Sequence, residues 1–282
     1  MVDINHLLRA ANEMAPLPAS CVRLARLVND PDSGTDALAE VVALDQALTV
    51  RLLRMANSAY SASETRVTDV SEALLRLDSA QVLAFAISMH ARAMMQNPIQ
   101  AYGLGEHELW KHSVRAALAV ELIPNVLKRS VPPATFAAAL LHDVGKLLMD
   151  RFLSEEEMDA LRRGRETGDL NLLQVEAQVM QVNHAELGGV IARHWNLPDP
   201  IVHGIIHHHE PERVKEEVPD LVYVANLAAK CADKSAAHEP VGLSIEKGVV
   251  DRTQIDAAGV DALANAVTER FDEVFQHYEA GD

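Results

Sequence analysis

The spacing of apolar residues constrains the fold of this chain more than any other feature of its sequence. Apolar residues recur every three or four positions along most of its 282 residues, which is the period of one helix face. In the stretch LPASCVRLARLV, for example, Leu17, Cys21 and Leu24 fall on one such face. Prolines and glycines separate the stretches, and none alternates apolar and polar residues as a half-buried strand would. The sequence therefore predicts an all-α fold.

Two changes in composition divide the chain. The segment NPIQAYGLGEH, residues 97–107, places one proline and two glycines between helical stretches, and AAHEPVGLSIEKG after residue 235 is typical of a linker. We therefore expect an N-terminal helical subdomain over residues 1–97, a second helical subdomain over residues 106–235, and a linker with one amphipathic helix over residues 236–282. Hydrophobic residues make up 49 % of the chain, which is enough for a substantial core.

Charge excludes several classes of partner. The formal net charge is −16, from 25 basic and 41 acidic residues, and it repels nucleic acids and anionic membrane surfaces. No apolar run is as long as a membrane span. Cys21 and Cys231 are the only cysteines, neither belongs to a CxxC motif, and the start of the chain lacks the pattern of an export signal. We therefore expect a cytoplasmic protein without nucleic-acid or membrane partners.

The stretch PPATFAAALLHDVGKLLMDRFL, residues 132–153, predicts one apolar helix with polar residues in its middle. His142 and Asp143 stand side by side, and Lys146 lies on the same side of the helix. A buried carboxylate needs a cation, so Asp143 either forms a helical ion pair with Lys146 or binds a metal. Gly145 costs roughly 1 kcal/mol inside a helix, which indicates that a neighbouring backbone or a ligand comes close there.

Histidines also mark three other helical segments. His112 lies on the face of its helix that should point inward, where a lone histidine is more often a core residue than a ligand. His184 follows an asparagine, the expected N-cap of the helix in NHAELGGVIARHWNLP. In IVHGIIHHHEP, His208 and His209 continue the apolar stripes of a helix, whereas the other two histidines point elsewhere.

Imidazole and carboxylate groups that arrive from four separate helices suit one or two divalent metal ions. Fe, Mn and Zn accept such nitrogen and oxygen ligands, and the absence of a nearby cysteine argues against a zinc finger. Two ions about 3.5–4 Å apart would activate a water molecule against phosphate esters. The histidine pattern therefore predicts a metal site, with hydrolysis as one use of it.

The order of these motifs resembles the HD superfamily of all-helical, metal-dependent phosphohydrolases. Within that superfamily, the N-terminal half is very similar to the HDOD (HD-related output domain) family, in the run ALDQALTVRLLRMANSAY and the following VSEAL. The resemblance extends from about residue 14 to about residue 232. It implies an N-terminal helical subdomain packed on an HD-like helical bundle.

The resemblance also assigns metal ligands. Six ligand positions of the superfamily are filled, by His112, His142, Asp143, His184, His208 and His209. At the last position the HD signature has an aspartate, and this chain has Asn226, a doubtful ligand because its amide is neutral. Asp233, seven residues further along, is the substitute that we consider.

Three interpretations remain. HDOD proteins are bacterial signalling modules, most of them with an incomplete ligand set and no established enzymatic activity. The resemblance thus implies a regulatory module that contacts a signalling protein and keeps a divalent metal in its HD-like pocket. The alternative is a phosphohydrolase for a nucleotide or another phosphate ester, with Asp143 and Lys146 as catalytic residues. The third is a metal-free scaffold. No GYP loop follows HHHEP, which disfavours a cyclic-dinucleotide phosphodiesterase, and we expect the regulatory module.

Overall fold

The structure is a computed structural model, and it describes residues 4–58, 67–167, 172–233 and 245–279. Throughout these ranges the chain forms helices joined by turns, and the one β-type contact is an isolated bridge between Ile99 and Leu104. The prediction of an all-α fold is confirmed.

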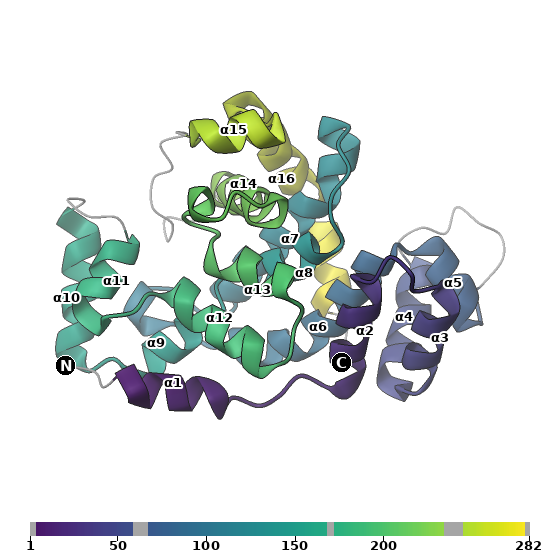
Figure 1. Cartoon of the computed structure of the whole chain (residues 1–282), viewed down its shortest axis with the longest axis horizontal. Helices are drawn as coiled ribbons and strands as arrows, with labels where there is room; N and C mark the ends of the chain where they lie inside the picture. The colour runs from purple at the N-terminus through teal and green to yellow at the C-terminus, as the bar shows by residue number, and fades with distance from the viewer. Residues whose placement is uncertain (1–3, 59–66, 168–171, 234–244, 280–282) are drawn as a thin grey trace.

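The N-terminal helices form one packed unit, which lies at the right in Figure 1. They are α2 (Ala19–Val28), α3 (Thr35–Ala43), α4 (Gln46–Ser58), α5 (Val70–Arg76) and α6 (Ser79–Met95). α3 packs against α2, α4 and α5, and α6 packs against α2. α6 begins at a capping box, in which the side chains of Asp78 and Gln81 accept hydrogen bonds from backbone N–H groups. A cap of this kind fixes where the longest helix of the unit starts.

The remaining core helices surround α8 (Ala134–Leu141), in which every residue is buried. The bundle also contains α7 (Glu108–Leu127), α9 (Lys146–Phe152), α12 (His184–His194), α13 (Asp199–Ile206) and α14 (Glu217–Ala232). α8 contacts α6, α7, α13 and α14. Such contacts on all sides are expected of a helix that is apolar all round. Through α6, this bundle is continuous with the N-terminal unit.

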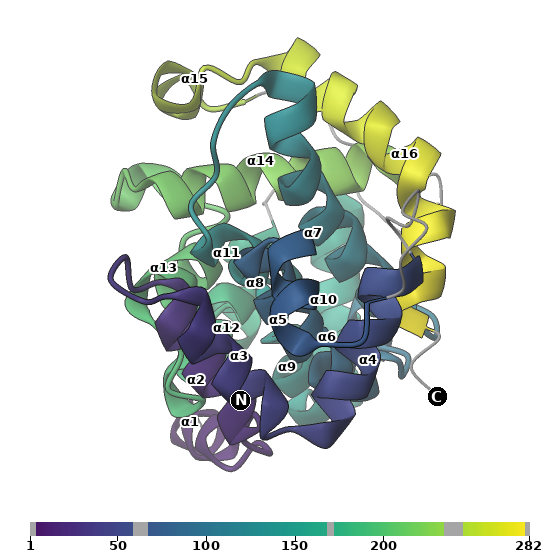
Figure 2. The ribbon, with the colours of Figure 1, turned by 90° about the vertical axis from the view of Figure 1, so that its right-hand side faces the viewer.

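Further elements lie around the bundle. They are α1 (Ile4–Asn12), η1 (Gln100–Tyr102), α10 (Glu155–Thr167), α11 (Leu172–Met180), η2 (Pro211–Arg213), α15 (Lys247–Thr253) and α16 (Ala257–Glu279). α1 packs on α9 and α12, at a distance from α3–α5 (Figure 1). Figure 2 shows α16 running along the outside of α7 and α14, where its Leu263, Val267 and Phe271 are buried. Most of the expected linker, residues 234–244, lies outside the described residues. None of the described helices combines the length and the apolar character needed to cross a membrane.

The helix predicted over residues 132–153 is interrupted, so that prediction is wrong at its centre. α8 ends at Leu141, a turn follows, and α9 begins at Lys146. The expected close approach at Gly145 is confirmed, because a Cβ atom there would lie 1.9 Å from the carbonyl oxygen of His184. The backbone of α12 therefore fills the space beside this turn, and tertiary packing rather than helix propensity sets the direction of the chain.

A buried ion pair ties the C-terminal segment to the bundle. Arg252, on α15, contacts the two carboxylate oxygens of Asp220, on α14, at 2.7 and 2.8 Å. It also donates to Glu212 at 3.0 Å. Asp220 is only 1 % exposed, so its negative charge depends on this partner.

Arg252→Ala is expected to lower the free energy of unfolding by about 2 kcal/mol, because it leaves the carboxylate of Asp220 buried without its cation. The effect stays moderate since Arg252 is itself 28 % exposed and water can partly replace it. The control is Arg162→Ala, which breaks an ion pair with Asp159 on the surface and should change the stability by less than about 0.5 kcal/mol. Urea unfolding measures both changes, and equal values would contradict the role given to Arg252.

Candidate metal centre

Six side chains predicted from the sequence lie together inside the bundle. This histidine cluster consists of His112 from α7, His142 and Asp143 from the turn after α8, His184 from the start of α12, and His208 and His209 from the turn after α13. Five of them are at most 2 % exposed, and His209 is half-buried. Titratable groups are rarely so buried without a charged or metallic partner.

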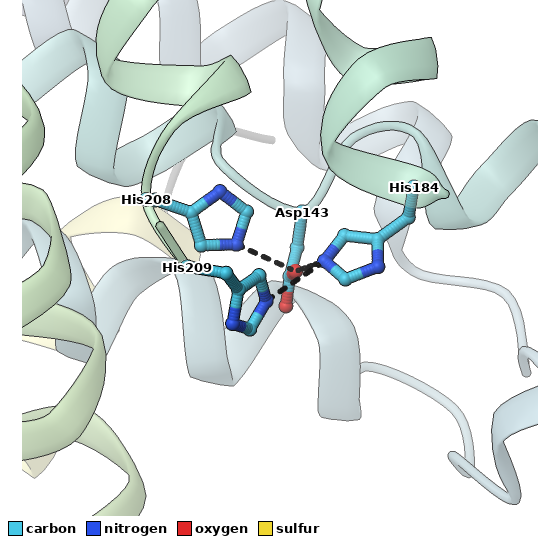
Figure 3. Close-up of side chains that lie close together, drawn as sticks. All are labelled: Asp143, His184, His208 and His209. Carbon is cyan, nitrogen blue, oxygen red and sulfur yellow. Dashed lines mark hydrogen bonds and ion pairs between the residues drawn. The ribbon is translucent and has the colours of Figure 1, made fainter. Parts of the chain in front are cut away.

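One half of the cluster, termed here the three-histidine group, comprises His184, His208, His209 and the Oδ1 atom of Asp143. Figure 3 shows these side chains pointing toward one another. One ligand atom from each lies within 4.8 Å of all the others. His184 Nε2 is 3.2 Å from Asp143 Oδ1 and 3.1 Å from His209 Nε2. His208 Nε2 is 3.9 Å from the same carboxylate oxygen.

The other half, termed the HD-motif group, comprises His112, His142 and the Oδ2 atom of Asp143. His112 Nε2 is 3.2 Å from His142 Nε2, and the two nitrogens lie 3.7 and 3.3 Å from Asp143 Oδ2. Asn226, on α14, adjoins this group, with its Oδ1 atom 3.1 Å from His112 Nε2. Asp143 therefore stands between the two groups and turns one oxygen toward each.

Two glycines, Gly145 in the turn before α9 and Gly189 on α12, let the segments that carry the ligands approach one another closely. At Gly145 the backbone touches the carbonyl oxygen of His184, as described above, and this contact sets Asp143 against the start of α12. On the opposite side, a Cβ atom at Gly189 would lie 2.2 Å from the side chain of Ile206. α13 can therefore approach α12 closely enough to place the turn with the last two histidines beside His184.

Hydrogen bonds orient two of the imidazole rings. His142 Nδ1 donates to the carbonyl oxygen of Ala139 at 2.7 Å, and His208 Nδ1 donates to that of Ile205 at 2.7 Å. A carbonyl oxygen can only accept, so Nδ1 carries the proton in each neutral ring. Nε2 is then an unprotonated nitrogen that faces the cluster, which is the state that a metal ligand requires.

Glu176, on α11, was not singled out by any sequence pattern, although it orients His184. It is fully buried and accepts hydrogen bonds from the backbone N–H of His184, from His184 Nδ1 and from the hydroxyl of Tyr102, at 2.7–2.8 Å. A carboxylate behind an imidazole fixes the ring and makes its other nitrogen a better ligand. The one available signal was a glutamate inside the apolar run LLQVEAQVM.

Asp143 is ionised despite its burial. Burial favours the neutral acid, but the interactions with His142, Lys146 and His184 outweigh it and hold the pKa of Asp143 well below its usual value. Lys146 Nζ donates to Asp143 Oδ2 at 2.7 Å. The sequence left open whether Asp143 pairs with Lys146 or binds a metal. In the structure the ion pair occupies one oxygen and leaves the other facing the three-histidine group.

The imidazoles of the three-histidine group differ in charge. Burial and the neighbouring imidazoles lower the pKa of His208 and of His209 well below the usual value, so both rings are neutral. Burial also opposes the charged form of His184, but Glu176 and Asp143 outweigh it and raise the pKa of that ring. His208 and His209 therefore present neutral imidazoles beside the carboxylate of Asp143.

Whether a metal ion would fit the three-histidine group can be judged from the hydrogen bonding of two of its buried atoms. Asp143 Oδ1 and His208 Nε2 have no hydrogen-bond partner among the described residues. Unpartnered buried acceptors are costly, and a cation placed between them would remove that cost. Nitrogen and oxygen donors without sulfur suit Fe, Mn or Zn. The residues present therefore fit a divalent metal ion.

Two other residues considered from the sequence lie away from the cluster. Asp233, considered as a substitute for Asn226, is a wrong assignment, because it pairs with Arg115 at 3.0 Å. Seven residues of helix span about 10 Å, which is too far for both side chains to reach one point. The first histidine of IVHGIIHHHEP, His203, pairs with Glu216 at 2.9 Å on the surface.

Comparisons with known proteins agree with this fold. The sequence matches the HDOD domain family over residues 14–211. An uncharacterized protein of Treponema pallidum (strain Nichols) is 23 % identical over 240 residues, which cover 83 % of this chain and 45 % of that protein. The chain thus spans about half the length of the curated relative that it matches.

Solved structures show the same fold. An HDOD domain protein of unknown function from Geobacter sulfurreducens has a TM-score of 0.66 at 24 % identity, over 99 % of this chain and 98 % of the other. A candidate phosphohydrolase from Shewanella amazonensis SB2B has a TM-score of 0.63 at 20 % identity, over 98 % and 96 %. A candidate signal transduction protein from Marinobacter aquaeolei VT8 has a TM-score of 0.73 at 17 % identity, over 98 % and 65 %. At these identities the likeness concerns the fold.

Proposed function

The chain belongs to the HDOD domain family, and from this membership we propose that it is a regulatory module of bacterial signal transduction that holds a divalent metal in its histidine cluster. The observation that carries the proposal is the pair of buried atoms, Asp143 Oδ1 and His208 Nε2, that have no hydrogen-bond partner in the described part of the chain. A divalent ion of Fe, Mn or Zn bound between these two atoms would supply the positive charge that they lack. His184, fixed by Glu176, and His209 complete the set of donors.

Burial of the cluster favours a regulatory role over catalysis. A phosphate ester would have to reach ligands of which five are at most 2 % exposed. The anionic ligand expected of an HD hydrolase is replaced by Asn226, whose neutral amide binds a divalent ion more weakly. Lys146 already pairs with Asp143, so its charge is not free for a phosphate group. A buried metal of this kind stabilises one arrangement of the helices that carry its ligands.

The proposed module acts through protein contacts. Large apolar side chains that are exposed within the described ranges occur in the N-terminal unit: Leu44 at 77 %, Val50 at 50 % and Leu75 at 79 %. A protein partner that covered these side chains would remove their apolar surface from water. The two cysteines, Cys21 and Cys231, are free, which agrees with the cytoplasm as the proposed location.

Thermal unfolding of the full chain tests this proposal. Metal-stripped protein should unfold several degrees below protein supplied with excess Zn²⁺ or Mn²⁺, because a ligand at 100 times its Kd stabilises the folded state by about 2.7 kcal/mol. The metal-loaded protein should not turn over a generic phosphate ester at a rate typical of enzymes. An unchanged midpoint contradicts metal binding, and rapid turnover favours the second candidate, a phosphohydrolase.

The phosphohydrolase is kept as a candidate because Lys146 lies at the edge of the cluster, where its side chain is 12 % exposed. Asn226→Asp would restore the anionic ligand of the HD signature beside His112. The variant is expected to bind more metal per chain than the natural protein, and any phosphate-ester turnover should rise with it. Metal analysis by mass spectrometry measures the change. Unchanged metal content would mean that residue 226 does not adjoin a possible metal position.

A further inference from the structure

We propose that a single metal ion binds in the three-histidine group, and that the HD-motif group is a hydrogen-bonded cluster that holds no metal. This inference rests on the proposed function, since it requires that the histidine cluster binds a metal. The two groups contain the same kinds of side chain and share Asp143. The hydrogen bonds around the two groups differ, and they indicate that the three-histidine group needs a cation and that the HD-motif group does not.

The three-histidine group presents acceptors to one point. His184 Nδ1 bonds the carboxylate of Glu176 at 2.8 Å, and His208 Nδ1 bonds a backbone carbonyl oxygen at 2.7 Å. Both partners can only accept, so both rings carry a proton on Nδ1, and His208 Nε2, which has no hydrogen-bond partner in the described ranges, faces inward as an acceptor. Asp143 Oδ1, an ionised oxygen, faces the same point. His208 Nε2 and Asp143 Oδ1 lie 3.9 Å apart, and two acceptors held this close repel one another unless a cation lies between them.

The atoms of the HD-motif group that would face a metal already have partners in hydrogen bonds and an ion pair. The side-chain amide of Asn226 lies 3.1 Å from His112 Nε2. Whichever way this amide is turned, it bonds the nitrogen that would otherwise bind a metal. When His112 carries its proton on Nε2, the unprotonated Nε2 of His142, 3.2 Å away, is a second acceptor for it. A metal here would have to break these bonds, and in addition to the two imidazoles and the carboxylate oxygen it would find a neutral amide where the HD signature has an aspartate.

Lys146 opposes a cation at the HD-motif group as well. Its ammonium nitrogen lies 2.7 Å from Asp143 Oδ2, the oxygen that belongs to this group. A divalent ion bound to the same oxygen would stand beside a fixed positive charge in a buried site. On the far side of the carboxylate, Oδ1 has no such neighbour and is without a hydrogen-bond partner in the described ranges. One oxygen of Asp143, Oδ2, thus pairs with Lys146, and the other, Oδ1, is available to the metal.

Three imidazoles and one carboxylate are sufficient for a four-coordinate ion. Isothermal titration of the metal-stripped full chain with Zn²⁺ is therefore expected to give about one equivalent per chain. His112→Asn and His208→Asn are a matched pair, since both residues are buried and each belongs to one group. His112→Asn should retain this equivalent, whereas His208→Asn should weaken binding at least about a hundredfold.

Other outcomes separate this inference from the proposed function. Two equivalents in the natural protein, or loss of Zn²⁺ binding in His112→Asn but not in His208→Asn, would overturn the inference while the chain remains a metal-binding module. A natural protein that binds no Zn²⁺ would overturn both. If circular dichroism shows that either variant does not fold, X-ray absorption spectroscopy of the Zn²⁺-loaded natural protein can count the imidazole ligands instead. Three imidazole ligands support the three-histidine group, and two point to the HD-motif group.

Discussion

Substituting alanine for Gly145 is expected to lower the free energy of unfolding by about 3 kcal/mol or more. The new Cβ atom would lie 1.9 Å from the carbonyl oxygen of His184 and 2.7 Å from the backbone nitrogen of Gly188. Both are backbone atoms of α12, so no side-chain rotation relieves the overlap. The segments that carry Asp143 and His184 would have to separate. Urea unfolding followed by circular dichroism measures the loss.

Gly105→Ala is the control for this substitution. A Cβ atom at Gly105 would meet only the flexible side chain of Glu108, at 3.6 Å, which is an ordinary contact. Its stability should stay within about 0.5 kcal/mol of the natural protein. Gly145→Ala should also bind metal more weakly than Gly105→Ala does, because the ligands on the two segments no longer converge. Similar stabilities for the two variants would contradict the close packing described for the start of α12.

Glu176→Gln is expected to weaken metal binding about tenfold to a hundredfold. Glutamine keeps the size of the side chain and can still accept from His184 Nδ1 and donate to the Tyr102 hydroxyl. It removes the negative charge behind the imidazole, and with it the support that makes Nε2 a strong ligand. Competition titration with a metal-binding dye measures the affinity of the natural protein and the variant.

Glu186→Gln provides the comparison, since Glu186 lies on α12, the helix of His184, but on its exposed side. It accepts a hydrogen bond from the backbone N–H of Asn183 in the capping box of α12, and glutamine can do the same. Metal affinity should therefore remain that of the natural protein. Equal affinities in Glu176→Gln and Glu186→Gln would show that the buried carboxylate does not tune His184.

The apolar periodicity was sufficient to predict the fold class and which ligands point inward. His112 and His208 continue apolar stripes, and both are buried. Asn183 could be identified as the cap of α12 because asparagine before an apolar helix and glutamate three residues later is a local signal. Signals of this kind depend on neighbours in the sequence, so they are visible without the tertiary structure.

Features set by distant segments could not be predicted in the same way. The turn after Leu141 depends on the backbone of α12, which lies some 40 residues away in the chain, whereas the local sequence favours a continuous helix. Glu176 resembles an ordinary surface residue of an amphipathic helix until α11 is placed beside His184. The position of α1 against α9 and α12 was likewise set by packing that no motif encodes.

Mass spectrometry of the metal content tests most directly whether the histidine cluster is a metal site. The protein is untagged and is purified without a chelator. The arrangement of His184, His208, His209 and Asp143 predicts about one equivalent of Fe, Mn or Zn per folded chain. A protein that is folded by circular dichroism and free of metal would contradict it. The buried histidines would then serve packing only.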